Sequence, residues 1–198
     1  MQPAIGGRPV GLRERKKERT RALIQHEALR LFAAHGYEQT TVEQIAEAAE
    51  VSTSTLFRYF SGKADIVRYD ALDPLLFDAY ARQPADLRPI VALRAAGREM
   101  LGGLPFGALN EQLARGRIIL AIPELRAAVY DDMATTLAAQ FTAAEISRTG
   151  RQPDPFAVDV LVGALSGGIT AAMQSAHDDD LATILDRALS LLEQGLPV

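Results

Sequence analysis

The sequence contains no cysteine, and this absence removes a whole group of possible sites. Without thiols the chain can form no disulfide bond, no thiolate metal site and no cysteine nucleophile. Histidine is scarce too, and the three that exist, His26, His35 and His177, lie far apart. We find no glycine-rich phosphate loop, no Gly-x-Ser-x-Gly turn and no metal-ligand spacing. The sequence therefore argues against an enzyme, and we expect neither a cofactor nor a metal.

Charged side chains are missing from Val160 to His177, which reads VLVGALSGGITAAMQSAH. A transmembrane helix needs about 20 predominantly apolar residues. This segment is shorter, contains three glycines, and is flanked by Asp159 and Asp178. We interpret it as a buried helix at a subunit interface and expect no membrane partner. The first thirty residues show no secretory-signal pattern, so we expect a cytoplasmic protein.

The net charge of −4 is unevenly distributed. The residues through Tyr69 carry 11 basic and 8 acidic side chains, whereas the residues from Asp70 onward carry 10 basic and 17 acidic ones. A polyanion would be repelled by the second part but not by the first. This asymmetry predicts two domains, 1–69 for nucleic-acid binding and 70–198 for another task.

Apolar residues recur at helical spacing, and no run of alternating β-branched residues indicates a sheet. Ile24, Ala28, Leu31 and Phe32 form the buried face of a first helix that ends near Gly36. Two short helices then follow within Thr41–Phe60. We predict an all-α fold of about nine helices, whose later members cover 63 to about 82, 86–102, 106–121, 124–149, 154–176 and 179–194.

The two short helices form a helix-turn-helix pattern. Thr40 with Glu43, or Thr41 with Gln44, has the spacing of a capping box, and Ser52 is placed to cap the second short helix. In such a motif the N-terminal residues of the second helix reach base edges in the major groove. Here that start is Ser52-Thr53-Ser54-Thr55, whose short hydroxyls can contact phosphates or bases. Leu56 and Phe60 are predicted to anchor the helix.

The stretch TTVEQIAEAAEVSTSTLFRYFSGKADIV resembles the signature of the TetR family of bacterial regulators, over roughly residues 20 to 68. The resemblance implies a three-helix DNA-binding domain, a linking fourth helix, and a variable helical ligand-binding domain. It also implies a dimer that binds operator DNA and leaves it when a ligand binds. Glu50 departs from the glycine that the family often has in the turn, at a cost of about 1 kcal/mol if the backbone there is left-handed.

The resemblance also implies roles for individual residues. Thr41 would contact phosphate, Thr53, Ser54, Thr55 and Arg58 would reach into the groove, and Tyr59 and Lys63 would hold the DNA backbone.

The basic N-terminal arm offers a further DNA contact. Gly7-Arg8-Pro9 resembles a hook whose arginine enters a narrow minor groove, and the alternative is a tail with incidental charge. Arg13, Lys16, Lys17 and Arg19 are predicted to continue the first helix and to neutralise phosphates. Together, the basic start of the first helix and the helix-turn-helix predict the following DNA-binding residues: Arg13, Lys17, Thr41, Ser52, Thr53, Ser54, Thr55, Arg58, Tyr59 and Lys63.

The second half is predicted to bind a small-molecule effector. Apolar residues there can line a cavity or simply pack as core, and the candidates for the cavity are Met100, Leu104, Phe106, Ile118, Ile122, Met133 and Phe141. Arg94, Arg98, Arg115 and Arg117 are near enough in sequence to grip an anionic group, or can form a solvated face. The stretches RGRIILAIPELRAAVYDDM and LDPLLFDAYARQPADL resemble actinobacterial TetR members, including regulators associated with mycofactocin gene clusters. This likeness implies a largely apolar effector, for example of acyl type.

The last two helices are predicted to form the homodimer interface. Small residues there allow close helix approach, and apolar residues add contact area. The expected interface consists of Gly163, Gly167, Ile169, Met173, Ile184, Ala188 and Leu191. In such a dimer, the second short helices of the two copies, which would contact the DNA bases, would lie one DNA turn or a multiple of one turn apart.

Other functions fit the sequence less well. His177-Asp178-Asp179-Asp180 could bind a divalent cation, but the aspartates are better explained as caps of the last helix. A helical small-molecule enzyme would need a catalytic constellation, which we do not find. A ligand-released repressor is favoured over an activator of the same fold, because a dimer on a promoter blocks polymerase without further machinery.

Overall fold

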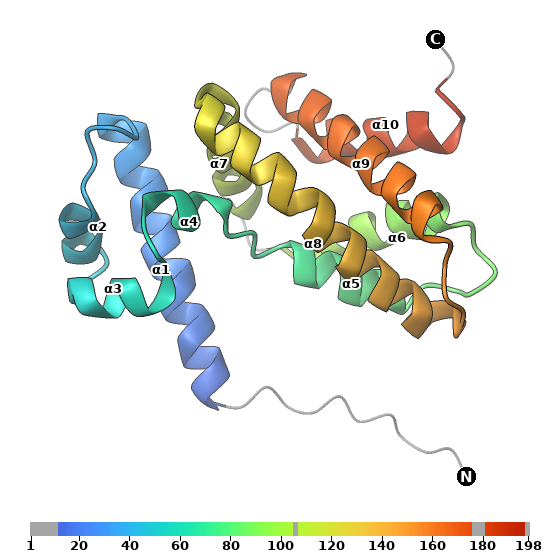
Figure 1. The fold of residues 1–198 in the computed structure, drawn as a ribbon, viewed down its shortest axis with the longest axis horizontal. Coiled ribbons are helices and arrows are strands. Elements are labelled where there is room, and N and C mark those ends of the chain that lie inside the picture. The colour runs from blue at the N-terminus through green and yellow to red at the C-terminus, as the bar shows by residue number, and fades with distance from the viewer. Residues whose placement is uncertain (1–11, 105–106, 176–180, 197–198) are drawn as a thin grey trace. The chain divides into compact units, whose positions relative to one another are not determined.

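The structure is a computed structural model that describes residues 12–104, 107–175 and 181–196. Within these residues there are ten α-helices and no strand, which confirms the predicted all-α class (Figure 1). The contacts divide the chain into two compact units between Ile66 and Val67. The division falls inside a helix, three residues before the predicted boundary.

The first unit contains three helices and the start of a fourth. They are α1 (Leu12–His35), α2 (Val42–Ala48), α3 (Thr53–Tyr59) and α4 (Lys63–Arg68). The predicted face of α1 is buried, with Ile24 and Ala28 fully inaccessible. Gly36 ends this helix at a φ of +86°, in the left-handed region that glycine adopts without steric cost. The short helices α2 and α3 complete this small core beside α1 (Figure 1).

The second unit is a larger helical assembly. It contains α5 (Asp73–Ala81), α6 (Pro89–Gly102), α7 (Ala108–Ala121), α8 (Pro123–Thr149), α9 (Pro155–Ser175) and α10 (Leu181–Glu193). The main core lies where α5 packs on α6 and α8, and where α8 packs on α9. Tyr80 and Phe141 are at its centre, with ring centroids 5.2 Å apart. A smaller cluster around Leu113 and Leu181 joins α7 to α10.

The prediction of one helix from Lys63 to about Arg82 is wrong. The chain leaves the helical path after Arg68 and starts α5 at Asp73, so there are ten helices in the described residues rather than about nine. One hydrogen bond and one proline explain the break. The Leu72 amide donates to the Asp70 carboxylate (2.8 Å) instead of to a carbonyl of the previous turn. Pro74, near the start of α5, has no amide hydrogen to donate and is tolerated only in a first turn.

The apolar helix α9 is long and apolar enough, by length and composition, to cross a membrane, and no other helix in the described residues is. Its composition has a different explanation in the fold. Val158 and Val162 are buried in the main core, and Ala172 is buried further along the helix. Packing within the chain therefore accounts for only part of this composition, because Phe156 (74%) and Val160 (55%) of the same helix are exposed.

Candidate DNA-binding surface

The turn between α1 and α2 confirms one of the two predicted capping boxes. The Gln44 amide donates to Thr41 Oγ1 (3.2 Å), and the Thr41 amide donates to Gln44 Oε1 (2.9 Å). Thr40 is only 1% exposed, and its hydroxyl donates to the Gly36 carbonyl (2.8 Å). Thr41 is therefore the residue at the N-terminus of α2, where the helix dipole and free amides favour a phosphate.

The turn between α2 and α3 is built on a left-handed residue. Glu50 has a φ of +54°, so the left-handed backbone on which the expected strain depends is present here. Its amide donates to the Glu47 carbonyl (3.0 Å), and the Val51 amide donates to the Ala46 carbonyl (2.9 Å). These two bonds satisfy the last carbonyls of α2 and close the tight turn of the motif.

The start of α3 is capped as predicted. Ser52 Oγ accepts a hydrogen bond from the Thr55 amide (3.1 Å) and lies 2.9 Å from the hydroxyls of both Ser54 and Thr55. Thr53 is exposed at the first position of the helix. The hydroxyls of 52, 54 and 55 thus form one short network, which holds the first turn of α3 in a defined shape before any DNA is present.

The far end of α3 is anchored by two buried side chains. Leu56 is inaccessible and Phe60 is 3% exposed, whereas Phe57 between them is 54% exposed. Arg58 is exposed, and its guanidinium carbon lies 5.3 Å from the centroid of the Tyr59 ring. This cation–π contact restrains the arginine on the surface and leaves its N–H groups available for hydrogen bonding.

Lys63 has a role that the sequence did not predict. Its ammonium donates to the carbonyls of Tyr37 (2.8 Å) and Glu38 (3.4 Å) and lies 4.6 Å from the centroid of the Tyr37 ring. Lys63 therefore joins the start of α4 to the turn after α1. An ammonium has three N–H donors, so one remains for a phosphate. No local pattern marks Tyr37, because its contact partner is 26 residues away.

The basic residues of α1 lie on the surface of the same unit. Arg13, Lys16, Lys17 and Arg19 are all exposed. Their spacing over two turns places several positive charges along one helix, which suits contact with phosphates. The Gly7-Arg8-Pro9 segment lies outside the described residues.

The residues predicted to line an effector pocket differ in burial. Phe141 is 2% exposed and belongs to the packed core beside Tyr80. Met100, Leu104, Ile118 and Ile122 are half-buried, while Phe106 and the side chain of Met133 lie outside the description. A hollow of about 590 Å³ lies instead between α8 and α9, lined by Thr135, Ala138, Asp159, Val162, Gly163, Ser166 and Gly167.

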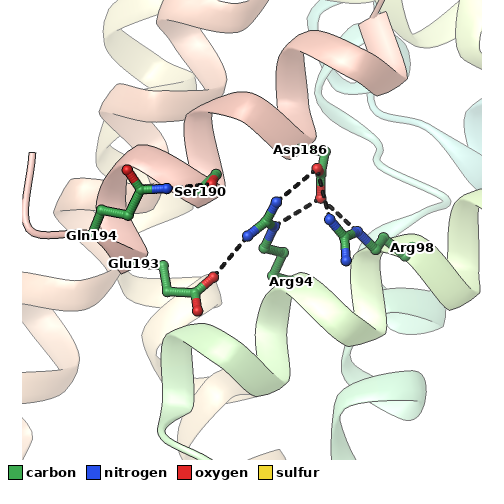
Figure 2. A network of polar contacts seen from close by, with 6 residues as sticks. All are labelled: Arg94, Arg98, Asp186, Ser190, Glu193 and Gln194. Atoms are coloured by element: carbon green, nitrogen blue, oxygen red, sulfur yellow. Dashed lines mark hydrogen bonds and ion pairs between the residues drawn. The ribbon is translucent and has the colours of Figure 1, made fainter.

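Two of the four predicted anion-gripping arginines form an internal network (Figure 2). Arg94 and Arg98 of α6 both donate two hydrogen bonds to the Asp186 carboxylate of α10, at 2.8–3.0 Å. Arg94 also donates to Glu193 (2.9 Å). These bonds hold the pKa of Asp186 well below its usual range. The pair thus attaches α10 to α6, and any anionic ligand there would have to displace Asp186.

The predicted interface residues divide between the surface and the interior. Gly163 and Gly167 of α9 are exposed, and a Cβ at either position would meet nothing within 4 Å. Met173 and Ile184 instead pack on the cluster around Leu113 and Leu181. Ala188 faces Gly168, at 3.8 Å from a Cβ built there, so α10 packs on α9 of its own chain. Ile169 is half-buried, and Leu191 is 36% exposed.

No group of three metal-ligating side chains occurs among 12–104, 107–175 and 181–196. The His177–Asp180 run falls in the part of the chain that is not described.

The chain matches two families of sequences. Residues 24–69 match the family described as bacterial regulatory proteins, tetR family, and residues 87–197, more than half of the chain, match the MftR C-terminal domain. The HTH-type transcriptional regulator TcmR of Streptomyces glaucescens is 46% identical over 102 residues, which are 50% of this chain and 45% of TcmR. The proposed mycofactocin biosynthesis transcriptional regulator MftR of Mycobacterium tuberculosis (strain ATCC 25618 / H37Rv) is 33% identical over 120 residues, 57% of this chain and 58% of MftR. The chain thus spans about half the length of these relatives.

A solved structure supports the same assignment. Thermus thermophilus FadR, a TetR-family transcriptional repressor in complex with lauroyl-CoA, is 25% identical with a TM-score of 0.52. The alignment covers 90% of this chain and 95% of that one. Both the helix-turn-helix and the larger helical unit are therefore shared with known transcriptional regulators. This chain belongs to the TetR family of bacterial transcriptional regulators, and its second unit is of the MftR C-terminal type.

Proposed function

We propose that this chain is a cytoplasmic repressor that binds a palindromic or pseudo-palindromic operator as a homodimer and releases it when a small molecule binds the second unit. The observation that carries the proposal is the start of α3. It is capped by Ser52, presents Thr53 to solvent, and is followed by an exposed Arg58. A preformed helix start with short polar side chains fits a major groove about 12 Å wide.

The charged surface of the first unit supports this DNA contact. The exposed side chains of Arg13, Lys16, Lys17 and Arg19 can each displace a counterion from the DNA backbone. We assign sequence reading to Thr53, Ser54, Thr55 and Arg58, and backbone contacts to Arg13, Lys17, Thr41, Ser52, Tyr59 and Lys63. An activator of the same fold would use the same contacts, and the position of the operator relative to the promoter would distinguish the two.

The exposed face of α9 supports the homodimer. α9 holds no lysine or arginine, as is typical of a buried helix, yet only 22% of its most apolar stretch is buried within the chain. Phe156 is 74% exposed and Val160 is 55% exposed, and Gly163 and Gly167 continue the same stripe one and two turns later. A long apolar stripe with small residues favours close packing against another helix. A second copy of α9 supplies such a partner in a symmetric arrangement.

The effector is proposed to be largely apolar. The second unit matches the MftR C-terminal domain, and FadR of similar fold binds lauroyl-CoA. Half-buried apolar residues at Met100, Leu104, Ile118 and Ile122 are the candidates for an acyl-type contact.

The test begins with selection of an operator from random duplexes by the full-length protein, followed by fluorescence polarisation at two salt concentrations. Arg58→Ala should weaken binding to the selected site by about 1–3 kcal/mol and change little on scrambled DNA. Lys17→Ala should weaken binding on both duplexes and reduce the salt slope by about one counterion.

Arg126→Ala is the matched control, because it removes one exposed positive charge from α8 of the second unit. It should leave both affinities unchanged. If the wild-type protein selects no sequence and shows no salt-dependent affinity, the repressor proposal is wrong. If Arg126→Ala acts like Lys17→Ala, overall charge rather than α1 causes the effect.

A further inference from the structure

Phe57 differs from the other aromatic and aliphatic side chains of α3 in being exposed. In the described residues of the first unit, the exposed large apolar side chains are those of Leu12, Leu23 and Phe57, and both leucines lie on α1. Phe57 is 54% exposed, although Leu56 beside it is inaccessible and Phe60 is 3% exposed. These two neighbours anchor α3, while more than half of the Phe57 side chain stays accessible to a binding partner.

The position of Phe57 on α3 places its ring beside the start of the helix. Residues three and four apart lie on the same face of an α-helix, so Phe57 shares a face with Ser54 and Thr53. Long side chains in a helix lean toward its N-terminus and cover the turn before their own Cα. Thr53 and Ser54 are exposed in that turn, whose shape is fixed by the Ser52 cap. The ring therefore extends the polar face that is proposed to enter the major groove.

A phenyl ring binds a different group from the hydroxyls on this face. It carries no hydrogen-bonding nitrogen or oxygen, so it cannot replace them as a partner of a phosphate or of the polar edge of a base. In the major groove thymine alone among the four bases presents a methyl group, at C5, and phenylalanine is one of the side chains that contact it. Contact between ring and methyl removes apolar surface of both from water. The exposed ring therefore fits a thymine.

We propose that Phe57 is a specificity-determining residue, whose ring contacts the C5 methyl of a thymine in each half-site of the operator. The inference rests on the proposed function. It adds an apolar contact to the hydroxyls and the guanidinium already assigned to sequence reading. Those groups read a base by hydrogen bonds, whereas Phe57 reads the one group in the major groove that forms none. The selected operator should therefore contain a thymine at the same position of both half-sites.

The experiment uses the full-length protein and its selected operator. Deoxyuridine replaces one thymine at a time, at matching positions of both half-sites, so each duplex keeps its base pairs and lacks only the C5 methyl. At one position the wild type should bind the uridine duplex about fourfold more weakly for each half-site, the factor expected for one buried carbon. Phe57→Ala should bind the thymine duplex more weakly than the wild type does, and it should not distinguish thymine from uridine at that position.

Leu23→Ala is the matched control, because it also removes an exposed apolar side chain (45%) from the first unit, but from α1. It should bind each duplex as the wild type does. A second variant addresses the methyl group of Thr53, which lies one turn before Phe57. Thr53→Ser removes this methyl and keeps the hydroxyl, and whatever its overall affinity it should still prefer thymine.

Three results would overturn the proposal. The first is a wild type that loses affinity at no uridine position. The second is a preference for thymine that persists in Phe57→Ala. The third is a preference that Thr53→Ser removes, which would assign the contact to Thr53.

If circular dichroism shows that Phe57→Ala is unfolded, Phe57→Gln replaces it, because glutamine has a similar length and no apolar ring. Phe57→Gln should bind the thymine and uridine duplexes equally, and a retained preference would overturn the proposal. Failure of the wild type to select any operator would instead contradict the proposed function. Selection of an operator whose thymines can all be replaced without loss would contradict only the role of Phe57.

Discussion

The Tyr80 hydroxyl of α5 donates a 2.6 Å hydrogen bond to the Glu145 carboxylate of α8, in the buried core of the second unit. Arg148 donates to the same carboxylate at 2.9 Å and to the carbonyls of Pro84 and Leu87. Residues far apart in the sequence are thus joined by one buried polar network. Burial, with the adjacent carboxylate, raises the pKa of Tyr80 well above its usual range, so the phenol stays protonated and remains a donor.

Glu145→Gln should destabilise the chain by about 3 kcal/mol, because it leaves the buried Arg148 without a counter-charge. Urea denaturation followed by circular dichroism measures the change. Glu99→Gln is the matched control: Glu99 pairs with Arg82, but both side chains are about half exposed or more (47% and 60%), so no measurable loss is expected. Equal effects of the two substitutions would contradict the importance of the buried network.

The stability of the chain should fall between about pH 4 and pH 7 through Asp73. Burial, together with the charge of Asp70, raises its folded pKa from the ordinary value of 3.8 to about 7, so the folded state binds more protons in this interval. Stability therefore decreases as pH rises toward 7 and levels off above it. Asp73→Asn should remove this slope and be more stable than the wild type at pH 8. Denaturation midpoints at pH 5 and pH 8 test this, and an unchanged slope in the variant would exclude Asp73 as its source.

Glu50→Gly should stabilise the helix-turn-helix by about 1 kcal/mol, because glycine adopts the φ of +54° without strain. Hydrogen exchange of the amides in 42–60 should slow by about fivefold, as expected for that free energy. Glu47→Gly, at an exposed position within α2, should instead speed exchange, since glycine weakens a helix interior. Faster exchange in Glu50→Gly would show that its side chain makes a contact that outweighs the strain.

Val160→Glu should weaken the proposed homodimer by about tenfold or more, because it places a charge on the apolar face of α9. Sedimentation velocity over a range of concentrations measures the dissociation. Leu75→Glu is the control, since Leu75 is similarly exposed (48%) but lies on α5. A dimer that tolerates Val160→Glu and not Leu75→Glu would place the interface on α5 instead.

Local patterns in the sequence were sufficient to predict most of the helices of the fold. The apolar face of α1 and the caps at Thr41 and Ser52 are confirmed, because each depends on residues within four positions of one another. The ranges predicted for α6 to α10 agree with the structure to within three residues at each end.

Contacts between distant residues decided the rest. The Arg68 carbonyl at the end of α4 accepts from a guanidinium 47 residues away, and the Lys63 ammonium donates to a carbonyl 26 residues away. Periodicity could show that Phe141, Met173 and Ile184 are apolar, but not which neighbour each one meets. By itself, the sequence determined most of the helices, the capped start of α3 and the family. Only the tertiary structure decided which charged side chains pair with each other and which apolar face of α9 stays uncovered, because these depend on how whole helices pack.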